Sequence, residues 1–138
     1  MEALYRCVSG ALAALLLFFA PIGPPAGCLL LFIAIDFCSG VAADRAMARR
    51  QGRAWFFESA EAWRTVTKAA LAIITLVMAH LLERWVLVET SCAPTRLFAG
   101  FACGVELWSF LENAAQLSEA PLFRLLRRYA RRRMKNER

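Results

Sequence analysis

The sequence lacks the elements that most enzymes need. It has one histidine, His80, and contains no GxSxG or HExxH motif and no glycine-rich phosphate loop. His80 therefore has no nucleophile and no orienting acid at a recognisable spacing. The five cysteines are scattered without a CxxC pair or histidine-rich spacing, so they assemble no zinc or redox motif. We expect a protein that is not an enzyme and that uses neither a metal nor a cofactor.

Apolar residues, in contrast, are in surplus. They make up 59% of the 138 residues, and the mean hydropathy is +0.47. Ordinary globular chains contain roughly 45–50% apolar residues. A soluble domain of this size could not bury such a surplus, because too much of a small fold remains at its surface. The composition predicts an all-α integral membrane protein with one membrane domain, residues 1–138.

Four apolar runs approach the length of about 20 residues that a helix needs to cross the bilayer. The predicted spans cover residues 3–20, 26–43, 66–87 and 97–111. The prolines between the first two interrupt the helix within an uncharged turn, which predicts a helical hairpin. The fourth run is short, but it can span if its charged flanks lie in the headgroup zone.

Two further segments carry mixed apolar and basic residues. In residues 54–65, the spacing of Trp55, Phe56 and Trp63 is close to one helical face, which predicts an amphipathic helix lying in the membrane interface between the second and third spans. Residues 121–138 begin as an amphipathic segment and continue as a basic tail.

Basic residues are distributed unevenly. Of the seventeen Lys and Arg residues, eight lie in 124–138 and six lie in 45–68. The positive-inside rule then predicts that both termini lie in the cytoplasm. The tail is expected to bind the anionic inner leaflet of the bilayer. Its candidate lipid-binding residues are Arg124, Arg127, Arg128, Arg131, Arg132 and Arg133. Nucleic acid is not an expected partner, because no soluble folding unit accompanies this tail.

Three ionisable residues fall inside the predicted spans: Asp36, His80 and Glu106. An acid at bilayer depth costs roughly 2.5–3.5 kcal/mol, so such residues are functional candidates. Their similar depths would let them meet, either as the lining of a water-filled space or as hydrogen bonds that fix packing between subunits. Lys68 most simply extends to the cytoplasmic interface, and an ion pair with Asp36 is the alternative.

The fourth predicted span has two unlike faces. Glu106, Ser109, Asn113 and Gln116 recur at helical spacing and form one polar stripe, whereas Gly100 and Gly104 point nearly opposite in a GxxxG spacing. This pattern predicts a pore wall that packs on one side and faces water on the other. The predicted pore-lining or intramembrane polar residues are Asp36, His80, Glu106, Ser109, Glu112 and Asn113, and the predicted helix-packing residues are Gly40, Gly100 and Gly104.

Residues 36–40, 68–82 and 106–113 resemble segments of the toxin-secretion and phage-lysis holin family. The resemblance covers about residues 26–128, and its most specific part is the pattern Glu-x-x-Ser-x-x-Glu-Asn that begins at Glu106. It implies a protein encoded by a phage, prophage or bacterium that oligomerises in the bacterial inner membrane. Such a protein opens lesions through which endolysin or a toxin cargo leaves the cell.

Two other functions remain open from the sequence. A small proton-coupled exporter would also place a carboxylate in the membrane, although exporters of this size resemble proteins with an essential acid in the first span, where this chain has none after Glu2. A structural subunit could use the polar stripe to bind a partner helix. Only Cys92 is expected to face an oxidising compartment, where it could cross-link two subunits.

Overall fold

The computed structural model describes residues 2–89 and 91–118, and these residues form helices and their connections without a strand. The elements are α1 (Glu2–Phe19), a 3-10 turn η1 (Ala20–Ile22), α2 (Gly23–Arg50), α3 (Ser59–Trp85) and α4 (Pro94–Leu117). All four apolar runs of the sequence are therefore helical. Helices α2, α3 and α4 each extend farthest beyond the predicted span at one end. In each case it is the end that the positive-inside rule assigns to the cytoplasm. The predicted basic tail, residues 121–138, lies outside the described residues.

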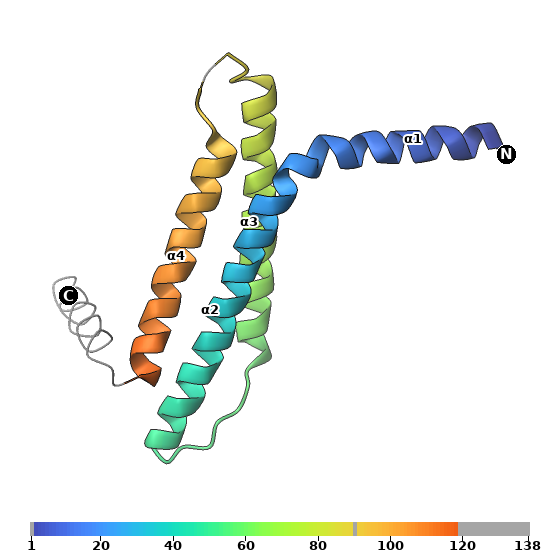
Figure 1. Ribbon diagram of the computed structural model, residues 1–138. Helices are drawn as coiled ribbons and strands as arrows, with labels where there is room; N and C mark the ends of the chain where they lie inside the picture. Colours follow the sequence, from blue (N-terminus) through green and yellow to red (C-terminus); the bar gives the residue numbers. More distant parts are fainter. Residues whose placement is uncertain (1, 90, 119–138) are drawn as a thin grey trace.

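α1 does not fold back on α2. It extends away from the other helices at a steep angle, and its N-terminus lies far from them (Figure 1). The predicted hairpin is therefore wrong. Phe19, Ile22 and Gly23 all keep right-handed helical backbone angles, so the chain bends through η1 without reversing. Prolines in the first turns of η1 and α2 are tolerated, because the backbone N–H that proline lacks has no helical partner there.

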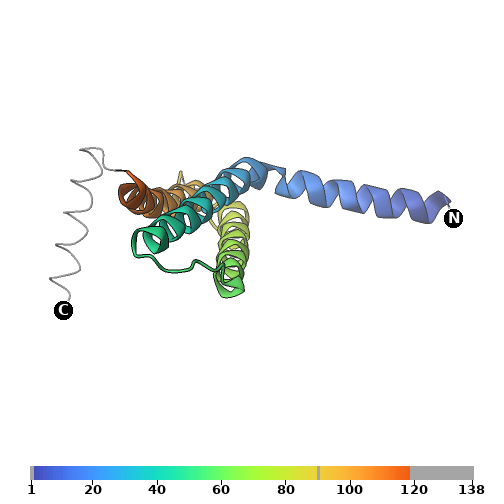
Figure 2. The ribbon, with the colours of Figure 1, turned by 90° about the horizontal axis from the view of Figure 1, so that it is seen from below.

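α2, α3 and α4 lie side by side as a bundle, and α2 packs most extensively against α4 (Figures 1 and 2). Its apolar core at the η1 end contains Ile22, Leu76 and Ala99, with Phe19 and Phe98 packed against them. The last residues of α1 reach this core, since Phe18 contacts the rings of His80 and Trp85. The bundle is thus closed at one end by apolar packing.

A glycine turn ends α2 at the opposite end of the bundle. Gly52 has a φ of 66°, and the Arg53 amide donates to the Ala48 carbonyl at 3.0 Å, which closes the helix as a Schellman motif. Residues 53–58 then run without helical structure, and Trp55 donates to the Asp44 carboxylate at 2.8 Å.

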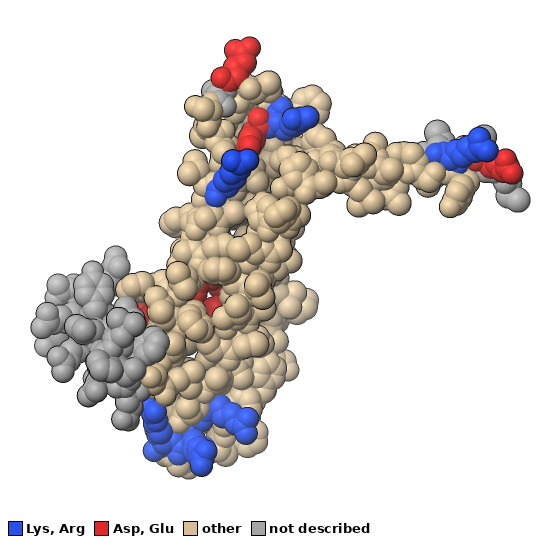
Figure 3. Space-filling model, viewed as in Figure 1, with Lys and Arg blue, Asp and Glu red and all other residues tan. Residues whose placement is uncertain are grey.

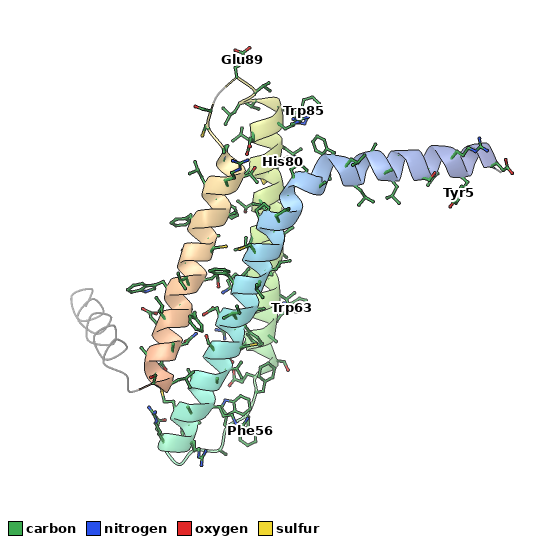
Figure 4. All side chains as sticks on the ribbon, in the orientation of Figure 1. Tyr5, Phe56, Trp63, His80, Trp85 and Glu89 are labelled. Carbon is green, nitrogen blue, oxygen red and sulfur yellow. The ribbon has the colours of Figure 1, made fainter. Side chains whose placement is uncertain are left out.

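The separate interfacial helix predicted for residues 54–65 is therefore not present. Residues 59–65 are helical, but they form the first turns of α3, because nothing in the sequence breaks the helix before the apolar run begins. Trp63, predicted to lie in the interface, is an exposed residue of α3, and Phe56 lies in the connection at the end of the bundle (Figure 4).

Most large apolar side chains face outward. Leu17 and Phe101 are each 74% exposed, while only Leu29 and Leu76 are fully buried among the large side chains described. Charged residues gather near the ends of the helices, and the middle of the visible face is almost free of them (Figure 3). Two described stretches, Val8–Arg50 and Ser59–Trp85, are long and apolar enough to cross a membrane. An apolar exterior with charged ends is the surface of a protein solvated by lipid.

Candidate functional site: a buried charge cluster

Three helices each contribute one charged side chain to the middle of the bundle. The Lys68 ammonium on α3 donates to Glu106 Oε2 on α4 at 2.7 Å and to Asp36 Oδ2 on α2 at 3.3 Å. Asp36 and Glu106 are buried, with 8% and 7% of their surface exposed. One cation therefore lies between two buried carboxylates and joins all three helices of the bundle.

Hydrogen bonds extend this cluster toward the Gly52 end of the bundle. Asn113 donates through Nδ2 to Asp36 Oδ1 at 3.1 Å and to Ser39 Oγ at 3.0 Å, and the Ser39 hydroxyl donates to the Asp36 carbonyl at 2.8 Å. Asn113 lies two turns after Glu106 on the same face of α4, and Ser39 lies one turn after Asp36 on α2. The helical repeat thus aligns the polar residues of both helices. We call Asp36, Ser39, Lys68, Glu106 and Asn113 the charge cluster.

The electrostatics of the charge cluster favour a closed bundle. A buried carboxylate without a partner is strongly unfavourable, and Lys68 provides the only ammonium or guanidinium that pairs with Asp36 and Glu106 among the described residues. The Lys68 side chain itself remains 43% exposed. Its aliphatic stem can therefore lie along the surface of α3 while its charged end reaches inward.

The three predicted helix-packing glycines differ in their surroundings. A Cβ added at Gly40 would lie 3.5 Å from Asn113 Nδ2, so α2 and α4 approach each other closely at this glycine. A Cβ at Gly100 or Gly104 would meet nothing within 4 Å. Both glycines are exposed on α4, away from the charge cluster. Gly40 therefore lies at a helix contact within the protomer, and the GxxxG face lies open.

The other polar residues predicted on α4 are less buried than Glu106. Ser109 is half-buried, and Glu112 is exposed and accepts a hydrogen bond from Trp108 Nε1 at 2.9 Å. The backbone carbonyl of Gln116 accepts from the Arg50 guanidinium at 3.2 Å, which joins the ends of α2 and α4. The most buried part of the stripe, from Glu106 to Asn113, thus faces the protomer's own helices.

His80 lies near the η1 end of the bundle, apart from the charge cluster (Figure 4). Its ring packs edge-on against Phe18, with centroids 5.5 Å apart, and lies 6.4 Å from the ring of Phe19. No hydrogen bond or ion pair within the described part of the chain joins it to Asp36 or Glu106. The polar residues predicted to meet therefore divide into two places.

Two members of the charge cluster go beyond the main sequence prediction. Lys68 makes the ion pair with Asp36 that was the alternative to extension toward the interface, and Ser39 is an addition to the predicted polar residues. The signal for Ser39 was its position three residues after a buried acid, where its hydroxyl can bond the backbone of the same helix turn. For Lys68, the signal was two membrane carboxylates with no other cation at their depth. The predicted lipid-binding arginines, Arg124 to Arg133, lie outside the described residues.

The fold and the charge cluster define a class: an α-helical membrane protein whose polar residues are turned inward and whose outer surface is apolar. Comparison of the sequence with known families is more specific. The bacteriophage holin family matches residues 13–130, and the chain belongs to that family. The same comparisons found no match among curated proteins and none among solved structures.

Membership of this family confirms the predicted resemblance and identifies a phage holin membrane protein of the bacterial inner membrane. The proteins of this family are not enzymes, which agrees with the lack of catalytic motifs in the sequence. The match begins earlier than the resemblance seen in the sequence and takes in part of α1. It includes the whole charge cluster.

Proposed function

We propose that this chain oligomerises in the inner membrane and permeabilises it, so that an endolysin or another protein cargo reaches the cell wall. The observation that carries this proposal is the family match over residues 13–130, together with a bundle that hides a polar stripe behind an apolar exterior. A monomer with this arrangement is stable in lipid. An assembly of such monomers has polar side chains available to line water.

The mechanism we propose is an exchange of partners. In the closed protomer, Glu106 and Asn113 are paired with Lys68 and Asp36. Opening requires α4 to separate from α2, after which water in an oligomer replaces the lost contacts. The open face of Gly100 and Gly104 would then lie against a second copy, because a surface of small residues permits close approach of helices. Ser109 and Glu112, at the edge of the stripe, would join the water-lined wall.

We further propose four spans with both termini in the cytoplasm, a topology in which α1 turns about η1 from the direction seen in the structure (Figure 1) and crosses the bilayer beside α2. α1 is apolar, and its described side chains before Phe18 are exposed, which suits a helix surrounded by lipid. The basic residues of 45–68 and of the tail then lie inside, where the tail binds anionic lipid. An impermeant maleimide applied to intact cells tests this topology. It should label Cys92 between α3 and α4 and leave Cys7 near the N-terminus unlabelled.

Permeabilisation is tested by inducing the gene in a bacterium that also holds a cytoplasmic endolysin. We expect the membrane potential to collapse suddenly at a fixed time after induction, followed by lysis. Glu106→Gln removes one charge of the cluster at constant shape, and it should shift that time. Growth without collapse, in cells shown to contain the protein in the membrane, would overturn the proposal.

A native pair of cysteines allows a sharper test of the opening step. Cys28 on α2 and Cys103 on α4 lie near enough for their thiols to interact. In a variant that keeps only these two cysteines, an oxidant should join α2 to α4, and loss of alkylation by maleimide would report the bond. The oxidised chain should fail to collapse the potential of vesicles until a reductant is added. Equal leakage before and after reduction would contradict the exchange of partners.

One observation favours a second function, proton-coupled export. A pocket of about 240 Å³ beside the charge cluster is lined by three carboxylates: Asp36, Asp44 and Glu61. Such a pocket would give protons a path to a buried acid. The same induction experiment separates the two functions, because an exporter raises drug resistance and leaves the membrane potential intact.

A further inference from the structure

A second polar site lies at the other end of the bundle, where α3 ends and α4 begins. Its pocket has a volume of about 640 Å³, within the usual range for small-ligand sites. The polar side chains that line it are His80, Glu83, Arg84, Ser91, Thr95 and Arg96, and the prolines before and within the first turn of α2 form another part of its wall. None of these side chains belongs to the charge cluster.

Two buried polar atoms in this pocket lack a partner in the described structure: His80 Nε2 and Thr95 Oγ1. Their residues are buried, with 8% and 5% of their surface exposed. Buried polar atoms in native proteins are nearly always paired with protein, water or a ligand. Two such atoms from different helices beside one pocket therefore make it a candidate ligand site.

The charges around the pocket are of both signs. Glu83 Oε2 accepts the Thr95 backbone N–H at 3.2 Å, so this carboxylate lies next to the unpaired Thr95 hydroxyl at the start of α4. Arg84 and Arg96 supply two exposed guanidinium groups at the same pocket. The pocket thus offers a carboxylate, two buried neutral acceptors and two exposed cations.

We propose that this pocket binds the phosphoethanolamine headgroup of a membrane phospholipid. A primary ammonium has three N–H donors, and the pocket has three acceptors for them in Glu83, Thr95 Oγ1 and His80 Nε2, with the His80 proton on Nδ1. The phosphate lies against Arg84 and Arg96, since guanidinium groups pair well with phosphate oxygens. A choline headgroup has no N–H donor, and a glycerol headgroup has no positive charge for Glu83.

The occupant is a lipid and not a free metabolite, because apolar side chains surround the pocket. Trp85, Val86 and Val88 are each at least 70% exposed beside it and can lie along acyl chains. Trp85 lies beyond His80 toward the end of the bundle, where tryptophan commonly meets the headgroup zone (Figure 4). This proposal does not depend on pore formation.

Native mass spectrometry of the full chain in detergent tests the proposal with phosphatidylethanolamine, phosphatidylcholine and phosphatidylglycerol of identical acyl chains at equal concentrations. We expect phosphatidylethanolamine to be retained several-fold more than either of the others. Equal retention of all three would show that the pocket does not select a headgroup and would overturn the proposal. A preference for phosphatidylglycerol would overturn the ethanolamine assignment. Retention of soluble phosphoethanolamine without retention of the lipid would overturn the lipid assignment.

Substitutions connect the preference to the pocket. Glu83→Gln keeps an oxygen for the Thr95 amide while removing the charge, and His80→Phe keeps a ring against Phe18. Each should bring the preference for phosphatidylethanolamine over phosphatidylcholine close to unity. Glu89→Gln, an exposed acid in the following connection, is the matched control and should leave the preference unchanged. A preference that survives both pocket variants in a folded chain would contradict the proposal.

Discussion

The two polar sites of the bundle differ in how their buried groups are satisfied. At the charge cluster, Lys68 pairs with both buried carboxylates and Asn113 adds two hydrogen bonds to α2. At the second pocket, His80 Nε2 and Thr95 Oγ1 have no partner in the described structure. A site completed within the protomer stabilises its fold, whereas a site left incomplete is available to a ligand. Substitutions should therefore have opposite effects on stability at the two sites.

Lys68→Met should have the largest effect, because it leaves two buried carboxylates without their cation. Breaking a buried ion pair costs about 3–5 kcal/mol, and the partial exposure of Lys68 places the expected loss near the lower end, about 3 kcal/mol. The free energy of unfolding in detergent micelles, obtained by denaturant titration, measures this loss. Arg64→Met, an exposed position one turn earlier on α3, should change it little.

The triple variant Lys68→Met, Asp36→Asn, Glu106→Gln separates lost charge from lost packing. Neutral side chains of similar volume can replace a buried ion pair with little loss. The triple variant should therefore recover more than half of the stability that Lys68→Met removes. If it is less stable than the single variant, the charge cluster does not act as a paired unit.

Asn113→Ala should have an intermediate effect. It removes hydrogen bonds to Asp36 and Ser39, and each buried bond of this kind contributes about 1 kcal/mol, so we expect a loss of about 1–2 kcal/mol. The same titration measures it, and lysis should begin earlier after induction because the closed bundle is weakened. For the unfolding titration, Glu112→Ala at an exposed position on the same helix serves as the control. Equal effects at the two positions would contradict the role assigned to Asn113.

Gly104→Leu should separate folding from assembly. No neighbour lies within 4 Å of an added Cβ, and replacing glycine inside a helix gains up to about 1 kcal/mol, so the protomer should be as stable as before or slightly more stable. Lysis should nevertheless be delayed or lost if this face packs against a second copy. Turbidity after induction reports the timing, with Gly104→Ala as the milder variant. Unchanged timing in both would remove the open glycine face from the assembly.

His80→Phe should have the smallest effect, and in the opposite direction from Lys68→Met. It removes a buried atom without a partner while keeping a ring against Phe18, so the free energy of unfolding without lipid should be unchanged or higher by less than about 1 kcal/mol. A loss of several kcal/mol on titration in lipid-free detergent would show that His80 is already satisfied within the protomer. The contrast between the two sites would then fail.

The sequence predicted the helices well and their arrangement less well. Long apolar runs determine where helices form, because the bilayer requires each segment to satisfy its own backbone. The same runs carry little information about which helices touch, since lipid and protein are equally apolar neighbours. The hairpin of α1 and α2 was wrong for this reason: prolines can break a helix or bend it, and only the backbone angles at Phe19, Ile22 and Gly23 distinguish the two.

For the candidate site, the helical repeat correctly aligned Glu106 with Asn113 and placed Gly100 and Gly104 opposite them. It could not show what the polar stripe faces, because a stripe of this kind suits water and suits a partner helix equally. The partner depends on Lys68 and Asp36, which are distant in the sequence and approach only through packing. Periodicity within one helix therefore identifies its polar face, and contacts between helices decide how that face is satisfied.

The bend at η1 makes α1 energetically separate from the bundle. Its contacts with the rest of the chain are confined to its last residues, chiefly Phe18 and Phe19. Segments that share few contacts open as independent cooperative units, so amide hydrogen exchange should find α1 protected to a different degree from α2, α3 and α4. The amino-terminal helix can then change its place in the bilayer while the bundle stays folded.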